Sequence, residues 1–165
     1  DPNNNTWTAT GPMIKPRIYG QSVRLADGRV LVVGGINLED TIPGGPPLKL
    51  SNSAEIYDPD LNTWFATGDL NEARYGHVIA YLQDGRVMVT GGAREYEWYW
   101  SDSSFIRELE IWEPLTGNWS LGYQFPLPGA YSTTVVLQDG RVWISGGKSG
   151  FHGQTFLADN WMVTP

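Results

Sequence analysis

Three stretches of the chain share one pattern, with β-favouring residues on both sides of an Asp-Gly pair. They read YGQSVRLADGRVLVVGG, GHVIAYLQDGRVMVTGG and YSTTVVLQDGRVWISGG. A β-rich run on each side of Asp-Gly predicts two antiparallel strands joined by a tight hairpin. A third run ends in proline, as in SAEIYDP at 53–59 and ELEIWEP at 108–114, and proline stops a strand because it cannot donate to the ladder. A fourth short run carries a tryptophan, so each unit is predicted to be a four-stranded antiparallel sheet.

These units repeat along the chain. DGRV occurs at residues 27–30, 84–87 and 139–142, which gives a period of about 56 residues. A glycine pair and a tryptophan keep the same offsets, and these structural markers are Gly34, Gly35, Gly91, Gly92, Gly146, Gly147, Trp7, Trp64 and Trp119. We therefore expect a single domain over residues 1–165, made of three repeats with seams near 1–59, 60–114 and 115–165.

The composition agrees with a folded all-β protein. Of the 165 residues, 41% are hydrophobic and 13% aromatic, which is enough to bury a core. The 20 glycines and 11 prolines show no collagen-like period, so they favour many turns and short strands over long helices.

Charge and residue usage exclude several classes of partner. The net charge of -7 argues against sequence-independent binding of nucleic acid or of an anionic membrane, because both need clustered Lys and Arg. No apolar run approaches the ~18 residues that span a bilayer, so the sequence predicts a soluble protein. The absence of cysteine fits a reducing compartment, which favours the cytoplasm, and is also compatible with secretion.

The order of these markers resembles the kelch repeat. A glycine pair follows a β-run, then Tyr or Trp precedes an acidic residue and proline, and a tryptophan comes about six residues later. The resemblance covers nearly the whole chain and implies a β-propeller, in which each repeat is one blade and the strands run outward from a central channel. The third repeat departs from the pattern, because Gly129 replaces Arg17 and Arg74 and its third strand, ADNWMVTP, lacks the usual aromatic residue.

The markers have a structural interpretation in such a fold. We expect the three tryptophans to lie between adjacent blades. The glycine pairs are expected where the backbone approaches a crowded axis.

The two ends of the chain belong to one seam of the repeat. DPNNNTW at 1–7 matches DPDLNTW at 58–64, so residues 1–10 are predicted to be a fourth strand that completes the blade left open at 165. Propellers have about 4 to 8 blades, so three blades are expected to need more chain. Two alternatives are open: a homodimer that forms a six-bladed ring, or membership of a longer propeller.

Candidate binding residues fall on the loops between strands, where recognition residues of rigid scaffolds gather. The segment EYEWYW contributes Tyr96, Trp98 and Trp100, and the third loop contributes His152. The aromatic side chains of EYEWYW either fold back on the blade or extend the hairpin, or they form a stacking platform for a peptide or a sugar.

A second group of candidates precedes the first strand of each repeat. It consists of Arg17, Tyr19, Arg74, Tyr75, His77 and Tyr131. The arginines are expected either to pair with a carboxylate of a neighbouring blade or to bind a carboxylate-bearing ligand.

Catalytic chemistry finds little support in the residues. Two histidines are too few for a multi-histidine metal site, and no nucleophile motif is present. A copper radical site like that of galactose oxidase needs a tyrosine cross-linked to cysteine, which this chain lacks. We expect no cofactor, no metal and no catalytic residue. The leading hypothesis is a non-enzymatic module that binds a protein or peptide by its loop face; the alternative is a carbohydrate-binding or mutarotase-like propeller.

Overall fold

The computed structural model describes residues 3–37, 49–96, 101–126, 129–150 and 155–165. Its longer strands form three antiparallel sheets that follow one another along the chain. The first sheet contains, in spatial order, β1 (Gln21–Arg24), β2 (Val30–Val33), β5 (Ala54–Asp58) and β6 (Thr63–Ala66). The second contains β7 (Val78–Tyr81), β8 (Val87–Thr90), β9 (Glu108–Glu113) and β10 (Asn118–Gln124). The third contains β11 (Thr133–Val136), β12 (Val142–Ser145) and β15 (Asn160–Val163).

Short elements extend from the ends of the second strands. The hairpin of β3 (Ile36–Asn37) and β4 (Lys49–Leu50) leaves the first sheet, and that of β13 (Lys148–Ser149) and β14 (Thr155–Phe156) leaves the third. Asp102–Ser104 form a 3-10 turn. Among the described residues, we find no helix with the length and apolar character needed to cross a bilayer.

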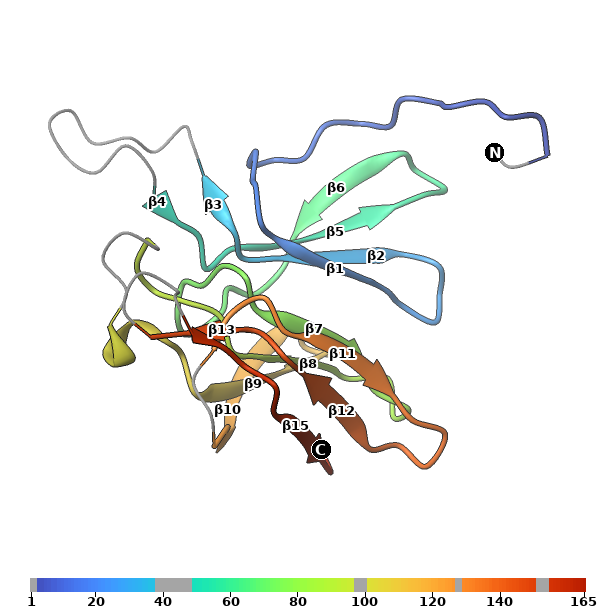
Figure 1. Ribbon diagram of the computed structural model, residues 1–165. Coiled ribbons are helices and arrows are strands. Elements are labelled where there is room, and N and C mark those ends of the chain that lie inside the picture. Colours follow the sequence, from blue (N-terminus) through green and yellow to red (C-terminus); the bar gives the residue numbers. More distant parts are fainter. Residues whose placement is uncertain (1–2, 38–48, 97–100, 127–128, 151–154) are drawn as a thin grey trace, which may run out of the picture.

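The core lies between the sheets, because each sheet has two apolar faces that a neighbour must cover. One cluster joins the first and second sheets and includes Leu31 and Val33 with Val87 and Trp112. A second cluster joins the second and third sheets in the same way. The inner strands β1, β7 and β11 lie next to one another, with β7 in the middle (Figure 1).

The three tryptophan markers differ in how deeply they are buried. Trp119 is buried between the first and second sheets, and Trp64 is half-buried. Burying an indole of about 200 Å² at about 25 cal/mol per Å² contributes at most about 5 kcal/mol. Trp7 is fully exposed in the single chain, because the described residues include no sheet on that side of the first sheet. Its expected place between two blades stays a prediction.

The glycine pairs lie at the predicted ends of the second strands, and all six of these glycines have positive φ. Residues 3–10 form no strand, and the third sheet has three strands among the described residues. The prediction that residues 1–10 complete a blade, with the repeat seams given above, stays a prediction.

Candidate functional site

Three tyrosines meet where the inner strands begin. Tyr19 precedes β1, Tyr75 precedes β7 and Tyr131 precedes β11. Their ring centroids form a triangle: Tyr19 lies 6.2 Å from Tyr75 and 6.3 Å from Tyr131, and Tyr75 lies 6.2 Å from Tyr131. Tilted and edge-on contacts at this spacing are favourable for aromatic rings. We call this group the tyrosine cluster.

Two members of the tyrosine cluster have an unusual backbone. Tyr19 has φ 56° and Tyr131 has φ 60°, in the left-handed region that L-residues other than glycine seldom adopt. The equivalent residue of the second sheet is Gly76, with φ 63°. The repeat therefore requires a left-handed residue at this position, and two of its three copies hold a tyrosine there although glycine would fit without strain.

Further groups extend the tyrosine cluster. The ring of Tyr96 lies 6.4 Å from that of Tyr75, whose hydroxyl donates to the carbonyl of Glu95 at 3.0 Å. The Lys148 ammonium lies 5.1 Å from the centre of the Tyr131 ring, within cation–π range. Beneath the cluster, Tyr75 packs in an apolar group with Ile36, Ala93, Phe105 and Ala130. Tyr19 remains 56% exposed and offers its ring to solvent.

The two candidate arginines have a different environment. Arg17 forms an ion pair with Glu55, and Arg74 forms one with Glu110 at 2.6 Å. These side chains are at most 3% exposed. Each glutamate lies on the third strand of the arginine's own sheet, not of a neighbouring sheet as the sequence suggested. The guanidinium groups are therefore withdrawn from any ligand at the surface.

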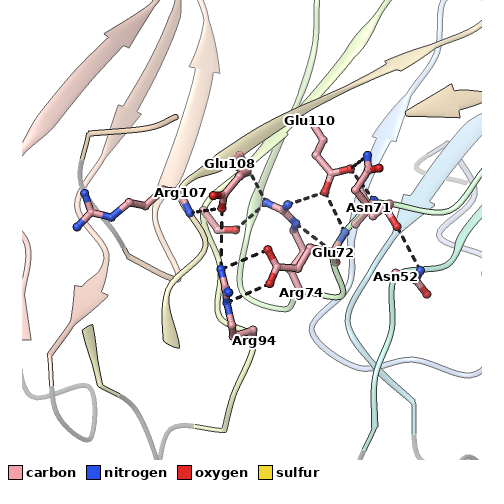
Figure 2. A network of polar contacts seen from close by, with 10 residues as sticks. Asn52, Asn71, Glu72, Arg74, Arg94, Arg107, Glu108 and Glu110 are labelled. Carbon is pink, nitrogen blue, oxygen red and sulfur yellow. Dashed lines mark hydrogen bonds and ion pairs between the residues drawn. The ribbon is translucent and has the colours of Figure 1, made fainter. Parts of the chain in front are cut away.

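The Arg74 pair has a complete set of hydrogen-bond partners. Its guanidinium donates to the carbonyl of Gly91 at 3.2 Å. It also donates to the carbonyl of Glu108 at 3.0 Å (Figure 2). The Glu110 carboxylate accepts from the backbone N–H of Asn71 at 2.7 Å and from that of Glu72 at 3.3 Å. Burial lowers the pKa of Arg74, and the nearby Glu110 carboxylate acts in the opposite direction. The pair thus ties the segment between sheets to β9.

The third sheet has neither the arginine nor the glutamate of this ion pair. Gly129 occupies the arginine position and Trp161 the glutamate position, while Pro126, which has no N–H, stands where Asn71 donates. The Trp161 ring instead packs edge-on against Phe125, with centroids 6.1 Å apart. Both charges and one backbone donor are absent together, so no buried charge is left unpaired.

His77 is buried with 2% exposure, between the inner ends of the first two sheets. Neither ring nitrogen has a hydrogen-bond partner in the described part of the chain. Burial, with a smaller contribution from the Arg74 charge, lowers its pKa to about 3. His77 also borders a groove of about 250 Å³ lined by polar residues of β1 and β11. Its imidazole is neutral at physiological pH and is not a surface binding group.

Three candidates lie outside the described residues: Trp98, Trp100 and His152. Within the described ranges, no group of three His, Asp or Glu side chains is arranged to hold a metal ion.

Sequence reasoning missed one feature. Glu55 and Glu110 were not recognised as partners of the arginines, although each stands two residues before the aromatic residue of its third strand. The repeat places Tyr19, Gly76 and Tyr131 at one position, and Tyr75 stands one residue before it.

No family model matches the chain. Comparison with curated proteins nevertheless finds similar proteins with kelch repeats. An F-box/kelch-repeat protein of Arabidopsis thaliana is 30% identical over 144 residues, covering 85% of this chain and 34% of that protein. Kelch-like protein 28 of Mus musculus is 36% identical over 91 residues, or 55% of this chain and 15% of that protein. The chain carries kelch repeats.

Kelch-repeat relatives also include an enzyme. Galactose oxidase of Gibberella zeae is 25% identical over 143 residues, covering 84% of this chain and 18% of that enzyme. The matches thus span about a third or less of these relatives' length.

Among solved structures, YjhT aligns with a TM-score of 0.76 at 20% identity, over 97% of this chain and 55% of that one. A fungal alcohol oxidase of the AA5 family, in complex with copper, aligns with a TM-score of 0.71 at 19% identity, over 90% of this chain and 31% of that one. These structures confirm the kelch-type β-propeller fold.

Proposed function

We propose that the chain is a protein- or peptide-binding module and that the tyrosine cluster is its contact surface. The observation that supports this proposal most strongly is the left-handed backbone of Tyr19 and Tyr131, at the position that Gly76 occupies in the second sheet. A left-handed tyrosine is disfavoured by about 1 to 3 kcal/mol, and such strain concentrates at functional positions. Retaining the two rings in this place is the signature of a binding role.

The chemistry of the tyrosine cluster suits a peptide. Tyrosine gives a large contact area with little loss of conformational freedom, and its hydroxyl can bind backbone groups of a partner. The three rings come from three sheets that pack rigidly together, so the surface is preorganised. Two of the three curated relatives given above are kelch-repeat proteins whose names state no catalytic activity.

The test removes the rings without disturbing the backbone. Tyr19→Gly with Tyr131→Gly gives both positions the residue that the second sheet already has, so the fold is expected to be retained. Peptides selected on the unmodified protein by display should bind the double variant at least tenfold more weakly in calorimetry, which corresponds to about 1.4 kcal/mol. Phe65→Ala, an exposed aromatic of β6, is the control and should leave binding unchanged. Equal affinity for the double variant would contradict the proposal.

A carbohydrate-binding or mutarotase-like function is the second candidate. It is supported by the galactose oxidase relative and by the capacity of exposed aromatic rings to stack on sugars. A glycan array discriminates between the two functions. Sugar binding that is lost in Trp98→Ala and Trp100→Ala, with no peptide selected, would favour this candidate.

We also propose, from the sheet arrangement, that more chain completes the ring. A homodimer forming a six-bladed ring and membership of a longer propeller remain the two alternatives, and the first is developed below.

A further inference from the structure

The amino-terminal segment, residues 3–11, has the backbone geometry that introduces a fourth strand. Asn5 has φ 55°, and the equivalent residues before β6 and β10, Asn62 and Gly117, have φ 51° and 71°. Left-handed residues are uncommon outside glycine. Their recurrence at one repeat position shows that the same turn is built three times.

The side chains of that turn repeat as well. The backbone N–H of Thr6 donates to Asn4 Oδ1 at 3.1 Å. At the start of β10, the N–H of Asn118 donates to Thr116 Oγ1 at 3.3 Å, and these two residues are equivalent to Thr6 and Asn4. The amino-terminal segment is thus shaped as the beginning of a strand like β10.

The end of the amino-terminal segment contacts the first sheet as the end of β6 contacts the second. Trp119 Nε1 donates to the carbonyl of Gly68, just after β6, at 2.8 Å. Trp64 Nε1 donates in the same way to the carbonyl of Gly11 at 2.9 Å. The segment therefore occupies the place of a fourth strand that belongs to a sheet preceding the first one.

That fourth strand has no sheet within the described chain. Trp7 is 100% exposed, and no β-ladder includes residues 3–10. Conversely, the third sheet ends at β15, whose outer edge has no partner among the described residues. An unpaired strand edge presents a row of free N–H and C=O groups, which is a template for strand addition.

We propose that the amino-terminal segment of a second copy of this chain adds to β15 as the fourth strand of the third sheet. The register follows from the complete sheets, where Tyr57 pairs with Trp64 and Trp119 with Trp112. It places Trp7 of the partner subunit opposite Val163. Thr8 of the partner subunit then lies opposite Met162.

The same register gives Trp7 a hydrogen-bond acceptor. In the two observed cases the indole bonds to the carbonyl of a residue at one repeat position, Gly11 or Gly68. The equivalent residue at the end of β10 is Tyr123. Tyr123 and its neighbour Leu121 are 87% and 62% exposed, so the surface that would receive the indole is uncovered in the single chain.

The outer face of the third sheet supports the same occupant. Val135, Trp143 and Met162 lie on this face and are 52%, 42% and 49% exposed. Their equivalents in the second sheet, Ala80, Met88 and Ile111, pack against the third sheet. Adding the partner's segment would bring the partner's first sheet over this apolar face, because Gly11 is already bonded to Trp64 of that sheet.

A second copy matches the edge better than the chain itself. The first and third sheets are separated by the second, and the amino-terminal segment leaves the first sheet on the side away from β15 (Figure 1). The fourth strands of the first two sheets each follow a left-handed residue and carry a tryptophan two residues after it. The amino-terminal segment has both features, and a twofold arrangement satisfies both copies at once.

Light scattering after size-exclusion chromatography tests the proposal. The unmodified protein should have twice the chain mass of 18.3 kDa. Trp7→Ala should return the mass to that of one chain that still unfolds cooperatively, since Trp7 is fully exposed in the single chain. The control Leu115→Ala, at a residue 93% exposed and remote from this contact, should keep the doubled mass. A single-chain mass at every concentration, or a dimer unaffected by Trp7→Ala, would overturn the proposal.

The register has its own test, because the chain has no cysteine. Chains carrying Thr8→Cys and chains carrying Met162→Cys, mixed and oxidised, should form a disulfide-linked pair. Thr10→Cys with Met162→Cys, two residues out of register, should not. Linkage of the second pair in preference to the first would overturn the register. The tyrosine double variant leaves this edge intact and should remain dimeric, so failure of peptide binding and failure of strand addition are distinguishable.

Discussion

Arg74 and Glu110 form an ion pair in which both side chains are fully buried, with 2.6 Å between Nη2 and Oε1. The pair connects the segment before β7 to β9 and satisfies the buried backbone groups around it. Two charges removed from water are stable there because each one has the other and further hydrogen bonds.

Replacing only one partner of the ion pair should strongly destabilise the protein. Glu110→Leu leaves the Arg74 guanidinium buried without a counter-charge and should lower the free energy of unfolding by about 3 to 5 kcal/mol. The measurement is urea denaturation followed by circular dichroism. Arg86→Met, which breaks the half-exposed Asp84–Arg86 pair, is the control and should cost at most about 1 kcal/mol. Similar losses in both variants would contradict the prediction.

Replacing both partners should destabilise the protein less than the sum of the two single substitutions. Arg74→Met with Glu110→Leu leaves no buried charge, so the double-mutant cycle should show a coupling energy of about 1 to 3 kcal/mol. The double variant should still be less stable than the unmodified protein, because the N–H groups of Asn71 and Glu72 lose their acceptor. The third sheet avoids one of these two losses, because Pro126 at the Asn71 position has no N–H. Additive single effects, measured in the same urea series, would refute this prediction.

The sequence predicted the sheets well because their signals are local. The Asp-Gly pairs within β-rich runs, and the proline that ends the third strand, each determine a turn or a strand end without reference to distant residues. The burial of Trp119 followed from the repeat in the same way. The exposure of Trp7 did not, because burial of an indole depends on whether a neighbouring sheet is present.

The site was harder to predict because it depends on which residues meet in space. Arg17 and Arg74 have the chemistry of ligand-binding groups, and only the position of Glu55 and Glu110 across the sheet shows that they are internal. The tyrosine cluster forms from three segments far apart in the sequence. The repeat register places Tyr19, Gly76 and Tyr131 at one position, but it does not show that the rings of Tyr19, Tyr75 and Tyr131 meet.

His77 should make the stability depend on pH in the mildly acidic range. Its pKa is about 3 in the folded protein, against about 6.5 in the unfolded chain. The unfolded state therefore binds an additional proton between these values, so stability is fully present above pH 6.5 and is lost as the pH falls toward 3. The loss attributable to this residue should reach about 2 kcal/mol between pH 6.5 and 5.

Denaturation curves across that range check the effect. His77→Gln removes the titrating group, so the dependence of stability on pH should flatten by about one proton. The other histidine serves as the matched control, and His152→Gln should leave the slope as it is. An identical slope in His77→Gln and the unmodified protein would show that His77 is accessible to protons in the folded state.

Gly92 and Gly85 have nearly the same φ but different surroundings, so alanine substitutions at the two positions distinguish backbone strain from steric crowding. Gly92 has φ 88° and Gly85 has φ 91°, so alanine at either position meets about 1 to 2 kcal/mol of left-handed strain. A Cβ on Gly92 would lie 2.7 Å from the carbonyl oxygen of Tyr75, whereas a Cβ on Gly85 meets nothing closer than the Tyr81 hydroxyl at 3.7 Å. Gly92→Ala should therefore destabilise by about 1 to 3 kcal/mol more than Gly85→Ala in urea denaturation. Because the contacted carbonyl accepts the Ala93 N–H beneath the tyrosine cluster, Gly92→Ala should also weaken peptide binding while Gly85→Ala does not. Equal stabilities for the two variants would mean that the inner end of β8 has room for a side chain and that φ alone determines the need for glycine.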